Sequence, residues 1–460
     1  MLAHLIRKEL LEQLLSLRFA MACIICLVIT LSSAVVLTRD YKEALADYRT
    51  NVVMHDNELE ESGDIWDDGV VIDKPLSPMR IFVRGIDPRL VVSARITHEQ
   101  QPIFEAEHEV NPVSFLFPPV DMLFFIGVVM SLLALAFGYD AVSGEKESGT
   151  LKLLMSYSAP RDLVLLAKWA GGYLALTAPF LLALTAALVV VMVMPGVELG
   201  EQDWTALVLL VAVGLLYLAA VYGMGILVSA RTHLTSTSIT VLLMVWVLMI
   251  LVVPNVAPYL AAEAVPLRNF VEVEEEKAAS DEAAGEAFGQ ELDEFQEKNP
   301  EVERWGDDGR WGAMWNLRWQ KRVLQRIDDE GRIEGRYANE LAAQVSLARN
   351  LSRLSPFSSF AYAATELAGA GLTEDRRFRE SLPEYRRRLT VYVTELYSRA
   401  WAEQRMGERH DLSGRPRWVY RPAPVAERLA AVLPDVMLLA AWTVLFFMAA
   451  YLSFLRYDIK

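Results

Sequence analysis

Long apolar runs alternate with polar segments along this chain of 460 residues. Six of the runs are close to the 20 or so apolar residues that a helix needs to cross the hydrocarbon core of a bilayer. The first two fall at 18–39 and 119–139, three more lie within 169–254, and the last is 429–456. The pattern predicts a mainly α, polytopic membrane protein with six transmembrane helices.

A shorter amphipathic stretch, residues 1–17, precedes the first span. Its apolar residues recur at helical spacing, which predicts a helix lying in the membrane interface. A cleaved signal peptide is the competing interpretation. The apolar run that follows is longer than the roughly 7–15 residues of a signal core, so we favour a retained span. The apolar positions are Leu2, Leu5, Ile6, Leu10, Leu14 and Leu17.

Two long polar segments separate the spans, at 40–118 and 255–428. The first combines helix-favouring residues with strand-like runs at 81–83, at 90–92 and around Ile96, which predicts a small mixed α/β domain. The second is helix-forming by composition and predicts a mostly helical domain.

Positive charge decides the orientation, because Lys and Arg beside the spans stay in the cytoplasm. The short loop 195–203 has neither, whereas the segments on the same side of the membrane as the amino terminus are basic. We therefore expect both termini, including a tail at 457–460, to be cytoplasmic, and both polar domains to be extracytoplasmic. The predicted location is a bacterial inner (cytoplasmic) membrane. The basic residues are Arg7, Lys8, Arg18, Lys146, Lys152, Arg161, Lys168, Arg231, Arg456 and Lys460.

Composition excludes several functions. The formal charge of −15 argues against a nucleic-acid partner, since phosphate binding needs clustered Lys and Arg. The two cysteines, Cys23 and Cys26, lie inside the first span, where apolar packing is favoured over metal binding. No Gly-x-x-x-x-Gly-Lys-Ser/Thr loop occurs, so the chain does not bind nucleotide by that device. We assign no catalytic residue, no metal ligand and no cofactor to it.

Two carboxylates begin spans close behind prolines, Asp121 in the second and Asp435 in the last. A carboxylate at membrane depth is a candidate pore residue. A Pro–Asp helix start is also a capping signal favoured by the helix dipole, and we prefer that interpretation for both.

Two further clusters favour structural roles. His98 and His108 with Glu105 and Glu107 have no standard metal spacing, and we expect surface positions. Trp305 precedes three tryptophans, at 311, 315 and 319, that mark one helical face. Core packing is the default there, with a substrate groove or a membrane-facing surface as the alternative.

The loop 140–168 carries the most specific pattern. It reads GYDAVSGEKESGTLKLLMSYSAPRDLVLLAKW from Gly138, a charged turn with glycines followed by a short amphipathic helix. A short helix held between two spans suits docking onto a soluble cytoplasmic partner. An ordinary connecting loop is the alternative.

At these residues the chain resembles the permease subunits of ATP-binding-cassette (ABC) type-2 exporters. That family shows an Asp, then Gly-Glu-Lys-x-x-Gly-Thr-Leu, then a Pro-x-x-Arg-like end between its second and third spans. The departure here is that the closing Pro and Arg are adjacent. Further pieces at 76–85, 354–369 and 456–458 resemble a subgroup with enlarged extracytoplasmic domains. The matching loop residues are Asp140, Gly144, Glu145, Lys146, Gly149, Thr150, Leu151, Pro160 and Arg161.

The resemblance implies a permease that dimerises with itself or a paralogue, in contact with membrane lipid, above a dimer of cytoplasmic ABC ATPase subunits. ATP and Mg would be held by that partner. Loop 140–161 would be the main coupling element, with 6–17 beside it and the turn 230–235 as a second contact. The expected function is substrate export across the inner membrane. The alternative is mechanotransmission, in which the ATPase drives the outer domains against a periplasmic protein. A sensor or scaffold is disfavoured, since it needs no docking helix.

Overall fold

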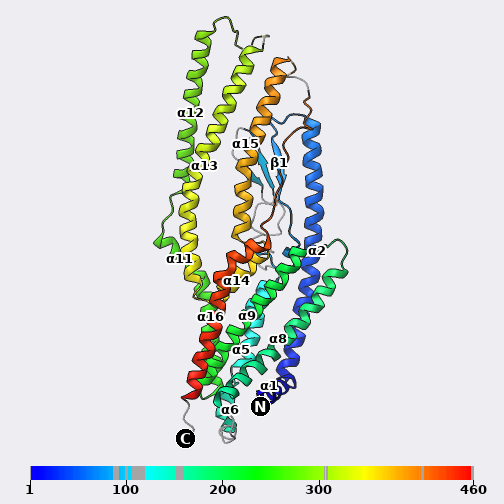
Figure 1. Ribbon diagram of the computed structural model, residues 1–460, viewed down its shortest axis with the longest axis vertical. Helices are drawn as coiled ribbons and strands as arrows, with labels where there is room; N and C mark the ends of the chain where they lie inside the picture. The colour runs from blue at the N-terminus through cyan, green and yellow to red at the C-terminus, as the bar shows by residue number, and fades with distance from the viewer. Residues whose placement is uncertain are drawn as a thin grey trace.

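The computed structural model describes residues 2–85, 93–98, 102–105, 120–151, 160–304, 306, 309–403, 405 and 409–456. These residues form a long rod with a helical bundle at one end and an outer module at the other (Figure 1). Among them, six helices are long and apolar enough to cross a membrane, which confirms the predicted fold class. The start of α1 and the end of α16 lie at the same end of the rod.

The six spans are built from eleven helical elements. Two of the spans contain a π-helical turn, η3 and η4, which widens the helix locally. In order they are α2 (Leu17–Ser62); α4 (Met122–Phe124), η3 (Phe125–Met130), α5 (Ser131–Gly138) and α6 (Ser143–Glu147); α8 (Arg161–Val193); α9 (Glu201–Arg231); α10 (Thr235–Val247), η4 (Leu248–Val252) and α11 (Val253–Ala264); and α16 (Val425–Leu455).

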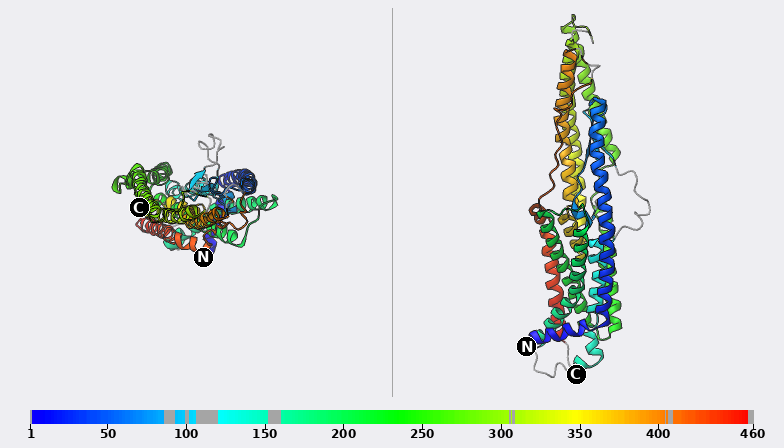
Figure 2. Two further views of the ribbon diagram at one scale, coloured as in Figure 1. Left: turned by 90° about the horizontal axis from the view of Figure 1, so that it is seen from above. Right: turned by 90° about the vertical axis from the view of Figure 1, so that its right-hand side faces the viewer.

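The amphipathic helix α1 (Leu2–Leu14) lies across the base of the bundle (Figure 2). It ends just before Ser16, whose hydroxyl accepts a hydrogen bond from the Phe19 amide at 3.2 Å and caps α2. A serine cap separates two helices here because its side chain replaces the missing intrahelical acceptor.

Two spans extend further than their apolar runs predict. Helix α2 continues as one helix to Ser62, so the start of the first polar segment prolongs the first span. The fifth span, predicted to lie within 169–254, likewise continues through Pro254 to Ala264. The π-helical turn η4 ends at Val252, two residues before the proline, so the hydrogen-bond pattern changes locally there without ending the helix.

Helix α9 lies at the centre of the bundle core, where Tyr217 and Tyr222 are fully buried. One partner of α9 comes from an unexpected place. Helix α14 (Pro356–Leu367) belongs to the second polar segment, yet its Phe360 ring stacks on Tyr217 with centroids 4.8 Å apart. The Phe357 ring on the same helix lies against Gly127 in η3, where a Cβ would come within 2.5 Å of it. Helix α14 therefore packs among the spans rather than in the outer module.

The outer module contains an antiparallel sheet in the order β1 (Val70–Asp73), β2 (Ser93–Ile96), β3 (Ile103–Glu105). Register pairs Val70 with Ile96 and Ala94 with Phe104. The strand expected at 81–83 is wrong. Ser77 caps a 3₁₀ turn, η1 (Pro78–Ile81), because Pro78 at its first position favours a turn over a strand. The run 90–92 lies outside the described residues.

Three long helices complete the module: α12 (Phe270–Lys298), α13 (Arg310–Ser352) and α15 (Leu372–Ala402). The two polar segments share one core, because Ile72 and Ile96 of the sheet pack with Phe378, Leu382 and Leu389 of α15. The first segment is mixed and the second helical, as expected, but together they form a single packed unit.

Aromatic rings fill the upper part of this unit. Trp315 and Trp319 stack at 5.0 Å, and Phe288 of α12 lies 5.6 Å from Trp319. The tryptophan face of α13 thus packs against α12, as the default interpretation held. Trp305 lies outside the described residues.

His98 is buried, so its expected surface position is wrong. The side chain is 1% exposed and its ring lies 4.0 Å from that of Trp66. Burial, together with the charge of Arg386, lowers the pKa of His98 from 6.5 to about 4. His108 and Glu107 lie outside the described residues, and within the described ones no group of three metal-ligating side chains occurs.

The His98 environment predicts acid sensitivity. The folded pKa lies below the unfolded value, so its contribution to stability is present above pH 6.5 and is lost as the pH falls towards 4. A shift of this size corresponds to about 3 kcal/mol in the free energy of unfolding. The midpoint temperature of thermal unfolding should be lower at pH 4.5 than at pH 7.5. His98→Gln should make this difference smaller. His233→Gln, at the opposite end of the rod, should keep the wild-type dependence, and equal dependence in all three proteins would contradict the assignment.

Candidate functional site

The site is the polar turn that follows α5, residues 139–151. Helix α5, the apolar part of span 2, ends at Gly138, whose backbone packs directly against Gly225 of α9. The amides of Val142 and Ser143 then donate to Ser229 Oγ at 3.0 and 2.9 Å. These bonds satisfy amides that the start of a helix leaves free, and they fix α6 against the end of α9.

Gly149 ends this turn with a backbone φ of +77°, a left-handed conformation that favours glycine. A Cβ added there would meet no atom of the residues that the structure describes within 4 Å, and Gly149 itself is exposed. Ser148 and Thr150 beside it are also exposed. Leu151 by contrast is 1% exposed and anchors the turn in the bundle core. Its expected amphipathic continuation, including Leu153 and Leu154, lies outside the described residues.

The turn between spans 4 and 5 packs against α6. Lys146 Nζ donates to the carbonyls of Ala230 and Thr232, the latter at 3.0 Å. Glu147 accepts from the amide and the hydroxyl of Thr235 at 2.9 and 2.8 Å. The two turns expected to contact a partner therefore lie side by side as one polar surface.

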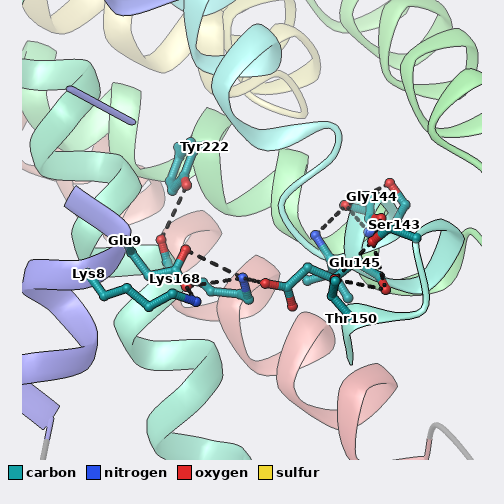
Figure 3. A network of polar contacts seen from close by, with 11 residues as sticks. Lys8, Glu9, Ser143, Gly144, Glu145, Thr150, Lys168 and Tyr222 are labelled. Carbon is teal, nitrogen blue, oxygen red and sulfur yellow. Dashed lines mark hydrogen bonds and ion pairs between the residues drawn. The ribbon is translucent and has the colours of Figure 1, made fainter. Parts of the chain in front are cut away.

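Lys168 joins three elements at the centre of this surface (Figure 3). Its side chain is 4% exposed, and Nζ lies 2.7 Å from Glu145 Oε1 and 3.3 Å from Glu9 Oε1. Glu9 belongs to α1, Glu145 to α6 and Lys168 to α8. A buried charge is costly unless it is paired, so the two carboxylates hold the lysine and the lysine holds α1 to the turn.

Close backbone packing supports the ion network. A Cβ on Gly171 would lie 2.8 Å from Glu9 Cβ, so glycine is what lets α1 approach α8. Tyr222 donates to the Lys168 carbonyl at 3.3 Å. Helix α1 is thereby part of the base of the bundle.

A second ion pair lies beside the network. Arg18 Nη1, at the start of α2, lies 2.8 Å from Asp140 Oδ2, and Nη2 donates to the Tyr139 hydroxyl at 3.0 Å. Between this pair and Lys168 lies an open cavity of about 1050 Å³, lined by α1, α2, α5 and the turn. Arg161 closes the site on its far side by donating to the Leu455 carbonyl at 2.9 Å, and Pro160 directly precedes α8.

The nine loop residues singled out in the sequence thus fall at one end of the bundle. The sequence did not single out Glu9 or its partnership with Lys168. A lysine directly before a span, and a glutamate on the polar side of the amphipathic helix, are the signals from which it could have been found.

The two span carboxylates have different surroundings. Asp121 caps α4, accepting from the Phe124 amide at 2.9 Å, as expected. The capping interpretation is wrong for Asp435, because α16 begins ten residues earlier, at Val425. Asp435 is instead fully buried and ion-paired with Arg349 and Arg353. Cys26 is buried, with its sulfur 3.5 Å from that of Met130, which agrees with apolar packing.

A six-span bundle with a polar turn and an amphipathic helix at one end defines a polytopic membrane protein. The sequence profile of the ABC-2 family transporter proteins matches residues 3–459, and the chain belongs to that family. In this family of permeases, ATPase activity lies in a separate subunit.

Two curated relatives bear the name probable ABC transporter permease protein NosY. The protein from Stutzerimonas stutzeri is 35% identical over 128 residues, which are 27% of this chain and 45% of the relative. The protein from Pseudomonas aeruginosa is 42% identical over 71 residues, 15% of this chain and 26% of the relative. Each match therefore spans less than half of the relative's length.

The ion network predicts a stability effect. Lys168→Met would remove the buried cation that Glu9 and Glu145 share and leave Glu9 only the exposed Lys8 at 3.9 Å, at a cost of about 3 kcal/mol in the free energy of unfolding. The midpoint of thermal unfolding in detergent should drop clearly. Adding Glu9→Gln and Glu145→Gln removes the unpaired charges and should restore most of the loss. An unchanged midpoint in Lys168→Met would contradict the assigned role.

Proposed function

We propose that the chain is the permease half of an ABC exporter, driven by a cytoplasmic ABC ATPase that docks on the turn 139–151 and on α1. The observation that carries this proposal is the buried Lys168, which joins α1, α6 and α8 into one unit. A force applied to the exposed surface at 148–150 would reach spans 2 and 3 together, since both are attached to that unit.

In this arrangement the ATPase dimer holds ATP and Mg, and the permease contributes only contacts. Ser148 and Thr150 expose small polar side chains on either side of Gly149, so this surface carries no large side chain that would keep a partner away. The neighbouring turn 230–235 enlarges it, because Lys146 and Glu147 attach the two turns to each other. Both termini and this surface would face the cytoplasm of a bacterium, with the outer module beyond the inner membrane.

A second permease, either another copy or a paralogue, would complete the transport unit. Span 5 supports this pairing, because only 11% of its most apolar stretch is buried within the chain. Its exposed face carries Thr237, Thr240 and Asn255. Polar side chains inside a membrane favour contact with another helix over contact with lipid. Lipid would cover the rest of the spans.

Mechanotransmission is the second candidate function, and one observation favours it. Helix α2 runs unbroken for 46 residues from the base of the bundle into the outer module. A continuous helix carries movement along its length, so an outer module attached in this way could act on a periplasmic protein without a substrate crossing the bilayer. Six spans favour export, since transmission alone needs fewer.

Gly149→Val tests the docking surface. An added Cβ meets no atom of the described residues within 4 Å, and the left-handed backbone costs about 1–2 kcal/mol, so the permease should still insert and fold. The ATPase that binds the wild-type chain should bind this variant at least about tenfold more weakly, because the valine side chain projects into the docking surface. Affinity measured in detergent or nanodiscs checks this.

Gly196→Val is the matched control, because Gly196, in the loop between α8 and α9 at the opposite end of the spans, also has a left-handed backbone, with φ +91°. Among the described residues, a Cβ added there would meet only Lys42 Cε, at 3.8 Å. It should bind the ATPase as the wild type does. Wild-type affinity in Gly149→Val would overturn the docking assignment.

A further inference from the structure

Asp435 is fully buried in the last span, and its partners come from the outer module. Arg353 Nε lies 2.7 Å from Oδ1 and Arg353 Nη2 lies 2.9 Å from Oδ2, a two-point contact. Arg349 Nη2 reaches Oδ2 at 2.6 Å, and its guanidinium lies 5.0 Å from the centre of the Tyr362 ring. Both arginines stand at the end of α13, within its last four residues or directly after it.

Stability alone is a poor explanation for this cluster. Removing a carboxylate and two guanidinium groups from water is expensive, and apolar side chains of similar size commonly serve a buried site as well or better. An ion cluster adds a defined orientation of one helix relative to another, because a two-point contact between guanidinium and carboxylate restricts the angle between the two helices that carry them.

The helix so fixed is long. Helix α13 has 43 residues, which corresponds to about 64 Å at 1.5 Å per residue. It runs from Asp435 to the far end of the outer module, where its tryptophans pack against α12 (Figure 1). A small change of angle at Asp435 therefore becomes a large displacement at the far end.

The other end of α16 contacts the candidate coupling site. Arg161 donates to the Leu455 carbonyl at 2.9 Å, and Arg231 Nε donates to Ser453 Oγ at 3.1 Å. Arg161 is the last residue of the loop pattern, and Arg231 belongs to the second turn. Helix α16 thus connects the docking surface with the base of α13.

We infer that Asp435 is a positioning residue through which α16 sets the angle of α13, so that movement begun at the docking surface reaches the far end of the outer module. This rests on the proposed function in one respect only, namely that an ATPase starts the movement. The joint itself belongs to the permease alone and can be measured without the partner.

The test is a distance distribution between spin labels at Leu317→Cys and Val444→Cys, in a protein whose own cysteines are replaced. Both positions are exposed, one on α13 and one on α16. The wild type in nanodiscs should give one narrow distance. The triple variant Asp435→Leu, Arg349→Leu, Arg353→Leu should fold, with a similar thermal midpoint, and its distribution should be at least twice as broad. A narrow wild-type distribution in that variant would overturn the inference.

Two further variants sharpen the result. Asp435→Asn keeps the shape of the side chain and should also broaden the distance distribution. If the triple variant does not fold, a narrow distribution in Asp435→Asn would overturn the inference. Asp121→Asn keeps a capping side chain at the start of span 2, makes no contact with α13, and should remain narrow.

The ATPase complex supplies a second, separate readout. With wild-type permease, ATP should shift the distance by several ångströms, and with the triple variant it should not, although the ATPase stays bound. If the ATPase binds and couples but ATP leaves the wild-type distance unchanged, the inference fails and the proposed function stands. If no ATPase binds, the proposed function fails and the distribution of the permease alone still decides the joint.

Discussion

A single buried cation, Lys168, determines how the base of this molecule is organised. Its ammonium group is nearly inaccessible to water and depends on carboxylates from two other elements, Glu9 and Glu145. Buried charges tolerate little separation, so α1, α6 and α8 are confined to one arrangement. The close approach of α1 to Gly171 gives the same arrangement a steric basis. A membrane-surface helix that could otherwise drift in the lipid interface is thereby made part of the bundle.

The same principle recurs at the other end of the spans. Asp435 is buried in an apolar helix and binds two arginines that arrive from outside the bundle. Ionic contacts thus tie α1 and α13 to the spans, while apolar packing holds the spans together around α9. Helix α14 contributes to that packing with Phe360, which closes the bundle beneath the outer module. Polar contacts specify attachment, and apolar ones supply the bulk of the cohesion.

The sequence was most informative where a property is local. Apolar length identified the spans, and the charged glycine turn at 140–151 identified the surface that we assign to docking, because both depend on neighbours along the chain. It was least informative where a contact joins distant segments. Nothing near Asp435 indicates Arg349 and Arg353, more than 80 residues away in the chain, and nothing near His98 indicates that α15 will cover it. The end of the fifth span was misplaced for another reason, because its helix continues through Pro254, as α8 and α16 continue through Pro179 and Pro434.

The central claim is that α1 and the turn 139–151 act as one unit that receives an ATPase. Hydrogen–deuterium exchange of the full-length permease in nanodiscs, with and without the bound ATPase, tests it most directly. The account predicts that backbone amides of Leu2–Leu14 and of 139–151 become protected together, in the same concentration range of ATPase, while those of α12 and β1–β3 do not change. Protection of one of the two segments without the other, or protection confined to the outer module, would contradict it.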